Sequence, residues 1–184
     1  MQGYEDPFYD NHALYKFVGV FRDSTIDDIR VARQKRFDQM FPLNGQSDPV
    51  YGKGNFVCIT LADEKFFNGS SKAKYDTDGD PIIDRHSLTR TDDDPDFYKN
   101  HILYEVVGAQ RHDDHITMLN AIKLSAYRVL QDKQKSLPVH SEKVKAWYQA
   151  CQAFCSGLRE TYNELGDVAW NKVLLRSAKS SRKS

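Results

Sequence analysis

The sequence predicts an all-α protein built from two copies of one helical unit. The first observation is a repeated phrase, because residues 8–22 and 97–111 share nine of fifteen positions at an offset of 89 residues. The second is that apolar residues recur at helical spacing after each phrase. The third is a polar break at corresponding places, followed in each copy by a further apolar-periodic segment.

Composition and charge exclude several classes of protein. The chain has 184 residues, of which 40% are hydrophobic and 28% are charged, as in ordinary globular proteins. Its 26 basic and 26 acidic residues cancel, so we expect no nucleic-acid binding driven by net charge. No apolar run reaches the roughly 18–20 residues of a membrane span. Three cysteines and an acidic N-terminus without a signal pattern predict an intracellular protein in a reducing compartment.

The first unit, residues 1–80, begins with a short helix in the repeated phrase. A long helix is expected between Ser24 and Phe41, capped by Thr25, and the break over residues 42–54 reads as a loop. A second long helix follows, and the unit closes on Tyr75-Asp-Thr-Asp-Gly-Asp80, whose glycine fits a helix end. The apolar faces of the two long helices are predicted to be Ile26, Ile29, Ala32, Phe37 and Met40, then Phe56, Ile59, Ala62 and Phe66.

The second unit, residues 96–167, repeats this order after a polar linker over residues 81–95. Its long helices are expected at about Asp114–Asp132 and after a break over residues 133–141, and it closes on residues 162–167. Residues 168–176 predict one more short helix, and a basic tail that frays in solvent completes the region 168–184. The apolar faces are Met118, Ala121, Ile122, Ala126 and Val129, then Val144, Trp147, Ala150, Cys151 and Phe154.

This order of segments resembles the J-domain co-chaperones, the DnaJ family. The family's opening Tyr-x-x-Leu-Gly-Val is similar to residues 15–20 and 104–109. Its last helix carries Phe-x-x-Ile-x-x-Ala-x-x-x-Leu and then Lys-Tyr-Asp, which the first unit matches from Phe56 to residues 74–76. The resemblance covers residues 8–80 and 97–167. It implies two tandem J-like hairpins, each a short helix with two long antiparallel helices.

A J-domain acts through a His-Pro-Asp tripeptide just after its second helix. The resemblance places the corresponding tripeptides at Phe41-Pro42-Leu43 and at Leu130-Gln131-Asp132. Only Pro42 and Asp132 match the family motif. Because Phe and Leu lack the donor and acceptor of an imidazole, and Leu43 lacks a carboxylate, neither unit is expected to stimulate a DnaK-type ATPase.

A basic cluster in the first long helix is a candidate partner-binding face. In the family, the basic face of this helix joins the tripeptide in docking on the chaperone. The second unit has only widely spaced basic residues on its equivalent helix. A solvated helix face is the commoner role of such charges, and both readings stay open here. The cluster consists of Arg30, Arg33, Lys35 and Arg36.

Other patterns favour structural roles over catalysis. His112 and His115 are close in sequence, but no third or fourth metal ligand is evident. Cys151 and Cys155 lie among apolar residues on one predicted helix and read as buried small hydrophobes. The acidic run at residues 76–81 lacks the glycine and glutamate of a calcium loop. We find no nucleophile–base set or nucleotide-binding glycine pattern, and expect no enzyme activity, metal or cofactor.

Three functions are compatible with this sequence. The first is a structural or accessory subunit that binds other subunits of a larger assembly, with a mitochondrial inner-membrane complex as the favoured setting and a cytoplasmic, cytoskeletal one as the next. The second is a regulator that resembles the J-like partner in the mitochondrial import motor and binds a true J-protein or the chaperone. The third is a metal- or thiol-dependent enzyme that uses the paired histidines or cysteines and contains bound metal.

Overall fold

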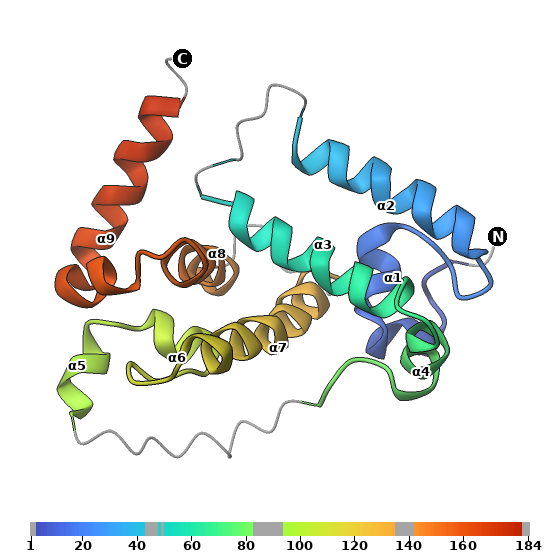
Figure 1. The fold of residues 1–184 in the computed structure, drawn as a ribbon, viewed down its shortest axis with the longest axis horizontal. Helices are drawn as coiled ribbons and strands as arrows, with labels where there is room; N and C mark the ends of the chain where they lie inside the picture. The colour runs from blue at the N-terminus through green and yellow to red at the C-terminus, as the bar shows by residue number, and fades with distance from the viewer. Residues whose placement is uncertain (1–2, 43–47, 49, 83–93, 135–141, 182–184) are drawn as a thin grey trace.

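Helices are the only regular elements in the part of the chain that the computed structural model describes, residues 3–42, 48, 50–82, 94–134 and 142–181 (Figure 1). This agrees with the predicted all-α class. The first repeat contains η1 (Pro7–Asn11), α1 (Ala13–Val18), α2 (Ile26–Met40), α3 (Gly52–Phe66) and α4 (Ser71–Asp78). The second contains α5 (Pro95–Lys99), α6 (Leu103–Val107), α7 (His115–Gln134), α8 (Glu142–Cys155) and α9 (Arg159–Ser181).

Each unit has more helices than the sequence predicted. A short helix, η1 or α5, precedes the predicted opening helix, and α4 or the start of α9 follows the second long one. The predicted cap of α2 is confirmed, since Thr25 and Asp28 bond each other's backbone N–H groups in a capping box. Helix α9 consists of two helical segments separated at Gly166, whose φ of 69° and ψ of 179° are not helical, and the second segment contains the C-terminal helix predicted over residues 168–176 and continues to Ser181 (Figure 1).

The two repeats pack against each other through α7, which runs beneath α3 toward α1 (Figure 1). Helix α7 contacts α1 and α3 of the first repeat as well as α6 and α8 of its own. Its predicted face is therefore largely buried, as is the whole predicted face of α8. Among the described helices, α2, the equivalent of α7, packs mainly against α1 and α3. Of its predicted apolar face Ile29 alone is fully buried, and Ile26 is exposed.

A close crossing of α3 and α8 forms the other contact between the repeats. Sequence analysis placed Gly54 in a loop, but α3 begins at Gly52, and the Gly54 backbone lies directly under the rings of Trp147 and Tyr148. The Tyr148 hydroxyl donates to Asn55 Oδ1 at 3.1 Å. With Gly54 and Cys58 on the buried side, Phe56 points outward and is 56% exposed, contrary to its predicted place in the core.

Neither α9 nor any other described helix is both long and apolar enough to cross a bilayer. Helix α9 is the longest of them, but only Tyr162, Gly166, Trp170 and Leu174 are buried along it. The remaining residues are half-buried or exposed, and many are charged. The buried apolar residues of α9 therefore pack against the rest of the protein, whereas Val168 and Leu175 are exposed.

Candidate functional site

The J-motif positions of the first repeat lie where α2 ends. Phe41 caps the helix, its backbone N–H donating to the Phe37 carbonyl at 2.8 Å. The Phe41 and Phe37 ring centroids are 4.7 Å apart, so the two side chains pack on each other. Pro42 is exposed, and Leu43 lies outside the described residues. The first position of this tripeptide contributes apolar packing.

The J-motif positions of the second repeat lie inside a helix instead of after it, because α7 continues to Gln134. Leu130 is buried in the common core. The Gln131 side-chain amide donates to Asp80 Oδ2 of the first repeat at 2.8 Å. Asp132 is half-buried next to it. These positions therefore form part of the contact between the repeats.

Asp80 is the centre of a buried polar cluster that closes the first repeat. We call this cluster the corner; it consists of Asp80, Tyr75 and the backbone N–H groups of Ala13 and Leu14. Its Oδ2 accepts the Ala13 N–H at 3.0 Å, at the start of α1, and its Oδ1 accepts the Tyr75 hydroxyl at 2.6 Å. The Tyr75 hydroxyl oxygen in turn accepts the Leu14 N–H at 3.2 Å. Burial, followed by the Asp80 charge, raises the pKa of Tyr75 above its ordinary value. The corner thus joins the two ends of the repeat with a satisfied polar network.

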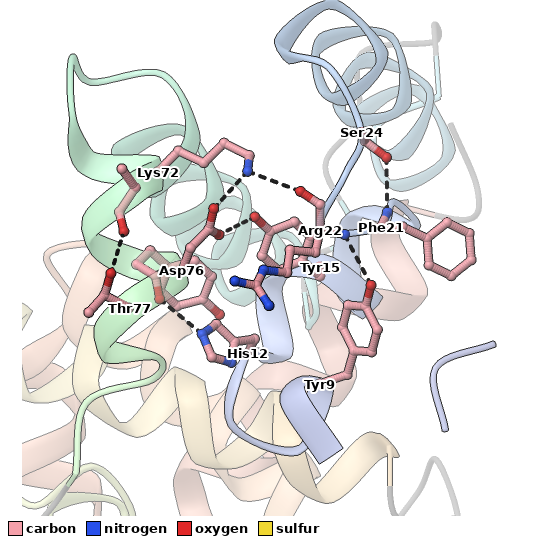
Figure 2. Close-up of polar contacts among 11 residues, drawn as sticks. Tyr9, His12, Tyr15, Phe21, Arg22, Ser24, Lys72, Asp76 and Thr77 are labelled. Carbon is pink, nitrogen blue, oxygen red and sulfur yellow. Dashed lines mark hydrogen bonds and ion pairs between the residues drawn. The ribbon is translucent and has the colours of Figure 1, made fainter. Parts of the chain in front are cut away.

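A histidine bridges the same two ends. His12 stacks on Phe8 with ring centroids 3.7 Å apart, and its Nδ1 lies 2.6 Å from the Phe8 carbonyl oxygen. Its Nε2 lies 3.0 Å from the Tyr75 carbonyl oxygen (Figure 2). Both ring nitrogens therefore face acceptors, and a neutral imidazole with one N–H satisfies only one of them. Donation to both carbonyls needs a proton on each nitrogen.

The second repeat rebuilds this corner from the equivalent residues. His101 stacks on Phe97 at 3.8 Å and lies between the carbonyl oxygens of Phe97 and Asn163, at 2.7 and 3.0 Å. Asp167 accepts the Tyr162 hydroxyl at 2.7 Å and the Ile102 N–H at 3.1 Å. His12 and His101, which occupy the same place in the repeated phrase, therefore have the same structural role, because each ties the start of its repeat to the end.

A cation fastens the loop after the opening helix in both repeats. Lys72 donates to the Arg22 carbonyl at 3.2 Å and to Asp76 at 2.8 Å, beside the Tyr15 hydroxyl that also bonds Asp76 (Figure 2). Arg159 takes the equivalent place in the second repeat. Its guanidinium donates to the carbonyls of Gln110 and Asp113 in the α6–α7 loop, and its Nε donates to the Tyr104 hydroxyl at 3.2 Å. The two repeats therefore share this contact, although the cation is a lysine in the first repeat and an arginine in the second.

Sequence analysis missed the carboxylates of the corners as site residues. It read both closing segments as helix ends, and the glycines do adopt positive φ there, 71° at Gly79 and 69° at Gly166. A usable signal was present, since both segments have the pattern Tyr-x-x-x-Gly-Asp. A carboxylate at the same distance from a tyrosine in two copies indicates a shared polar contact.

The four basic residues of the predicted partner face have different surroundings. Arg33 makes a two-pronged ion pair with Asp63 of α3, at 2.7 and 2.5 Å. Arg36 donates to the Phe17 carbonyl at 2.7 Å, and Arg30 bonds Asp27. Lys35 is exposed on the outer side of α2. Arg33 therefore serves mainly to hold α2 on α3, whereas Lys35 and Arg30 are the exposed cations of the cluster.

The paired histidines and cysteines do not form a metal centre. His112 accepts a bond from the Arg111 guanidinium at 3.1 Å. Cys151 is buried, and burial raises the pKa of Cys155 to about 11, which disfavours the reactive thiolate in both. Within the described ranges, no group of three or more His, Cys, Asp or Glu side chains is arranged to hold a metal ion.

Comparison with known proteins adds no relative to this description. No protein-family model, no curated protein and no solved structure matches the chain. The geometry of the corners and of the contact between the repeats is therefore the basis for assigning a function.

Proposed function

We propose that the protein is a non-catalytic adaptor or accessory subunit of a larger assembly, built from two J-like units that do not stimulate a DnaK-type ATPase. The observation that carries the proposal is the Gln131–Asp80 contact, in which a J-motif position is used to join the two repeats. A helical segment whose Gln131 side chain is engaged in this way is not free to meet a chaperone. The mitochondrial inner-membrane setting, and the cytoskeletal one after it, belong to the same proposal through the resemblance.

The first repeat supports the proposal in a different manner. Its helix α2 is accessible, but Phe41 takes the place of the motif's histidine and packs on Phe37. An aromatic hydrocarbon side chain cannot accept or donate the hydrogen bonds that an imidazole makes. We therefore assign α2 a role in binding and not in activation.

A steady-state ATPase assay with a DnaK-type chaperone tests this function. The unaltered protein should leave the basal rate unchanged, whereas a variant with Phe41→His and Leu43→Asp should raise it, because α2 keeps its exposed face. The matched control combines Phe41→Asn with Leu43→Asp, which adds polarity without an imidazole and should stay at the basal rate. Strong stimulation by the unaltered protein would contradict the proposal.

The outer face of α2 favours a second candidate, a regulator that binds a true J-protein or its chaperone. This face holds a hollow of about 490 Å³ whose lining includes the aliphatic side chains of Val18 and Val31 and the cations of Lys35 and Arg36. Val31 is 71% exposed. An exposed aliphatic side chain beside cations suits a partner that presents apolar and acidic groups.

Adding the protein to an ATPase reaction already stimulated by a J-protein separates the two functions. A regulator should lower the stimulated rate, and Lys35→Glu combined with Val31→Asp should remove that effect. The control is Lys172→Glu, which changes an exposed charge on α9, away from this face. An unchanged rate with the unaltered protein would leave the accessory-subunit function alone.

A further inference from the structure

The corner of the first repeat is covered by the end of α7. Ala13 has 0% of its surface exposed and Asp80 only 2%. Helix α7 packs against α1, and its Gln131, which follows the buried Leu130 in the sequence, donates to Asp80 Oδ2. The first corner is therefore covered by the end of a helix, α7, in which an aliphatic residue is followed by a residue with a side-chain amide.

The corner of the second repeat has the same construction without that cover. Ile102 stands at the position of Ala13 and is 51% exposed, while Val168, next to the carboxylate, is 67% exposed. Asp167 Oδ2 accepts the Ile102 N–H, as Asp80 accepts that of Ala13. Among the described residues no side chain donates to Asp167 Oδ2 in the way that Gln131 donates to Asp80. The carboxylate of Asp167 and the exposed side chains of Ile102 and Val168 therefore lack the cover that α7 gives to the first corner.

The second part of α9 covers only a portion of this corner. Trp170 packs edge-on against Tyr162, with ring centroids 5.8 Å apart, and Leu174 is buried beyond it. These contacts shield the tyrosine of the corner. They leave Ile102 and Val168 in solvent, together with the half-buried Asp167 between them.

We propose that this second corner, formed by Ile102, Asp167 and Val168, is a docking surface for the end of a helix from a partner protein. The partner helix brings an aliphatic residue followed by a side-chain amide, which donates to Asp167 Oδ2. The template is the bond of Gln131, which follows the buried Leu130, to Asp80 of the first corner. The inference rests on the proposed adaptor function and deepens it by naming the chemistry of the partner.

A second copy of this chain fits the surface less well. Its α7 is already engaged with its own first corner. The end of its α2 carries Pro42 at the position of Gln131, and proline has neither a side-chain donor nor a backbone N–H. We therefore assign the surface to a different protein.

A peptide with the sequence of residues 118–134, the occupant of the first corner, is a suitable probe. Labelled and titrated with the full chain, it should bind saturably, with a dissociation constant below about 1 mM. Ile102→Glu should weaken binding by about tenfold or more, because a second carboxylate beside Asp167 opposes the apolar contact. The matched control is Ile116→Glu, an exposed isoleucine on α7 outside the corner, which should leave binding unchanged.

Two variations make the test decisive. A peptide with Gln131→Glu should also lose about tenfold, because its carboxylate meets Asp167. Methyl NMR should place the shifts at Ile102 and Val168 and not at Ala13, which reports displacement of the chain's own α7. Absence of binding to the unaltered chain, or equal binding to Ile102→Glu, would overturn the proposal.

Self-association is the remaining outcome. A concentration-dependent dimer in sedimentation that Ile102→Glu abolishes would assign the surface to a second copy and overturn the inference of a different partner. The ATPase assay does not involve this corner, so a corner that binds nothing leaves the proposed function standing.

Discussion

Two glycines determine how each repeat closes on itself. Gly79 has φ 71° and ψ −159°, and Gly166 has φ 69° and ψ 179°, a region open essentially only to glycine. In this conformation the backbone passes close to Asn11 and Asn100, whose carbonyls accept the N–H groups of Asp80 and Asp167 at 2.7 and 2.9 Å. The glycines therefore bring both the backbone and the carboxylate of each corner to the start of the repeat.

Gly79→Ala should destabilise the protein strongly. A Cβ at this position would lie 2.1 Å from Asn11 Nδ2 and 2.7 Å from the Asn11 carbonyl oxygen. Backbone strain of about 1–3 kcal/mol adds to that overlap, so the expected loss in the free energy of unfolding is about 3 kcal/mol or more. Urea denaturation followed by circular dichroism measures it.

Gly19→Ala is the matched control. Gly19 also has positive φ, 88°, but a Cβ there meets no atom within 4 Å. Only the left-handed backbone penalty of about 1–2 kcal/mol is expected. Equal losses in the two variants would show that the close approach at Asn11 contributes nothing.

At the scale of elements, the crossing of α3 and α8 depends on Gly54. A Cβ at this position would lie 2.4 Å from Tyr148 Cδ1 and 2.7 Å from Trp147 Cζ3, and both rings are buried. Gly54→Ala gains about 1 kcal/mol of helix propensity but overpacks the crossing at a cost of about 1–3 kcal/mol. We expect a net loss of about 1 kcal/mol, measured as a lower urea midpoint.

A double-mutant cycle distinguishes this crossing from a local effect on α3. Tyr148→Leu removes the ring that the new methyl group meets, so the two changes together should cost less than the sum of each alone. Strict additivity would mean that Gly54 does not lie against the ring.

The elements were predictable wherever the determining interaction is local in sequence. The cap at Thr25, the apolar face of α8 and the glycine ends all follow from residues within a few positions of each other. The start of α3 was missed because Gly52 and Gly54 resemble loop residues, and only the distant rings of α8 explain a glycine there. Whether the Phe56 side chain points into the core or into solvent likewise depends on which helices cover α3.

The candidate site was predictable only in part for the same reason. The repeated Tyr-x-x-x-Gly-Asp pattern contained the corner residues. The contact of Gln131 with Asp80 joins residues 51 positions apart, and no spacing within either repeat indicates it. The exposure of Ile102, against the burial of Ala13, depends on where α7 lies in the whole molecule.

For the molecule as a whole, the buried phenols and thiols predict loss of stability at alkaline pH. Burial raises the pKa of Tyr15, Tyr75 and Tyr162, and raises that of Cys155 to about 11, above the ordinary 9.0. The unfolded chain therefore releases these protons at lower pH than the folded protein. The stabilisation is fully present below about pH 9 and is lost as pH rises through the folded-state pKa values.

We expect the urea midpoint to fall steadily above about pH 9, and tyrosinate absorbance to appear together with the loss of helical circular dichroism. Exposed tyrosines would instead ionise while the helices remain. A tyrosinate signal from most phenols in a protein with unchanged circular dichroism would contradict the burial described for the corners.

The bonds between Asp80 and Asn11, and between Asp167 and Asn100, also determine how the chain would carry mechanical load. Each bond joins residues at opposite ends of one repeat, so a pull applied to the two ends reaches this short bridge before it reaches the helices between them. The contacts of α7 and α8 with the first repeat would have to separate before the two repeats move apart, while each repeat stays closed until its own bridge opens. A protein tethered at both ends would thus lengthen in steps, as the contact between the repeats and then the two corners give way.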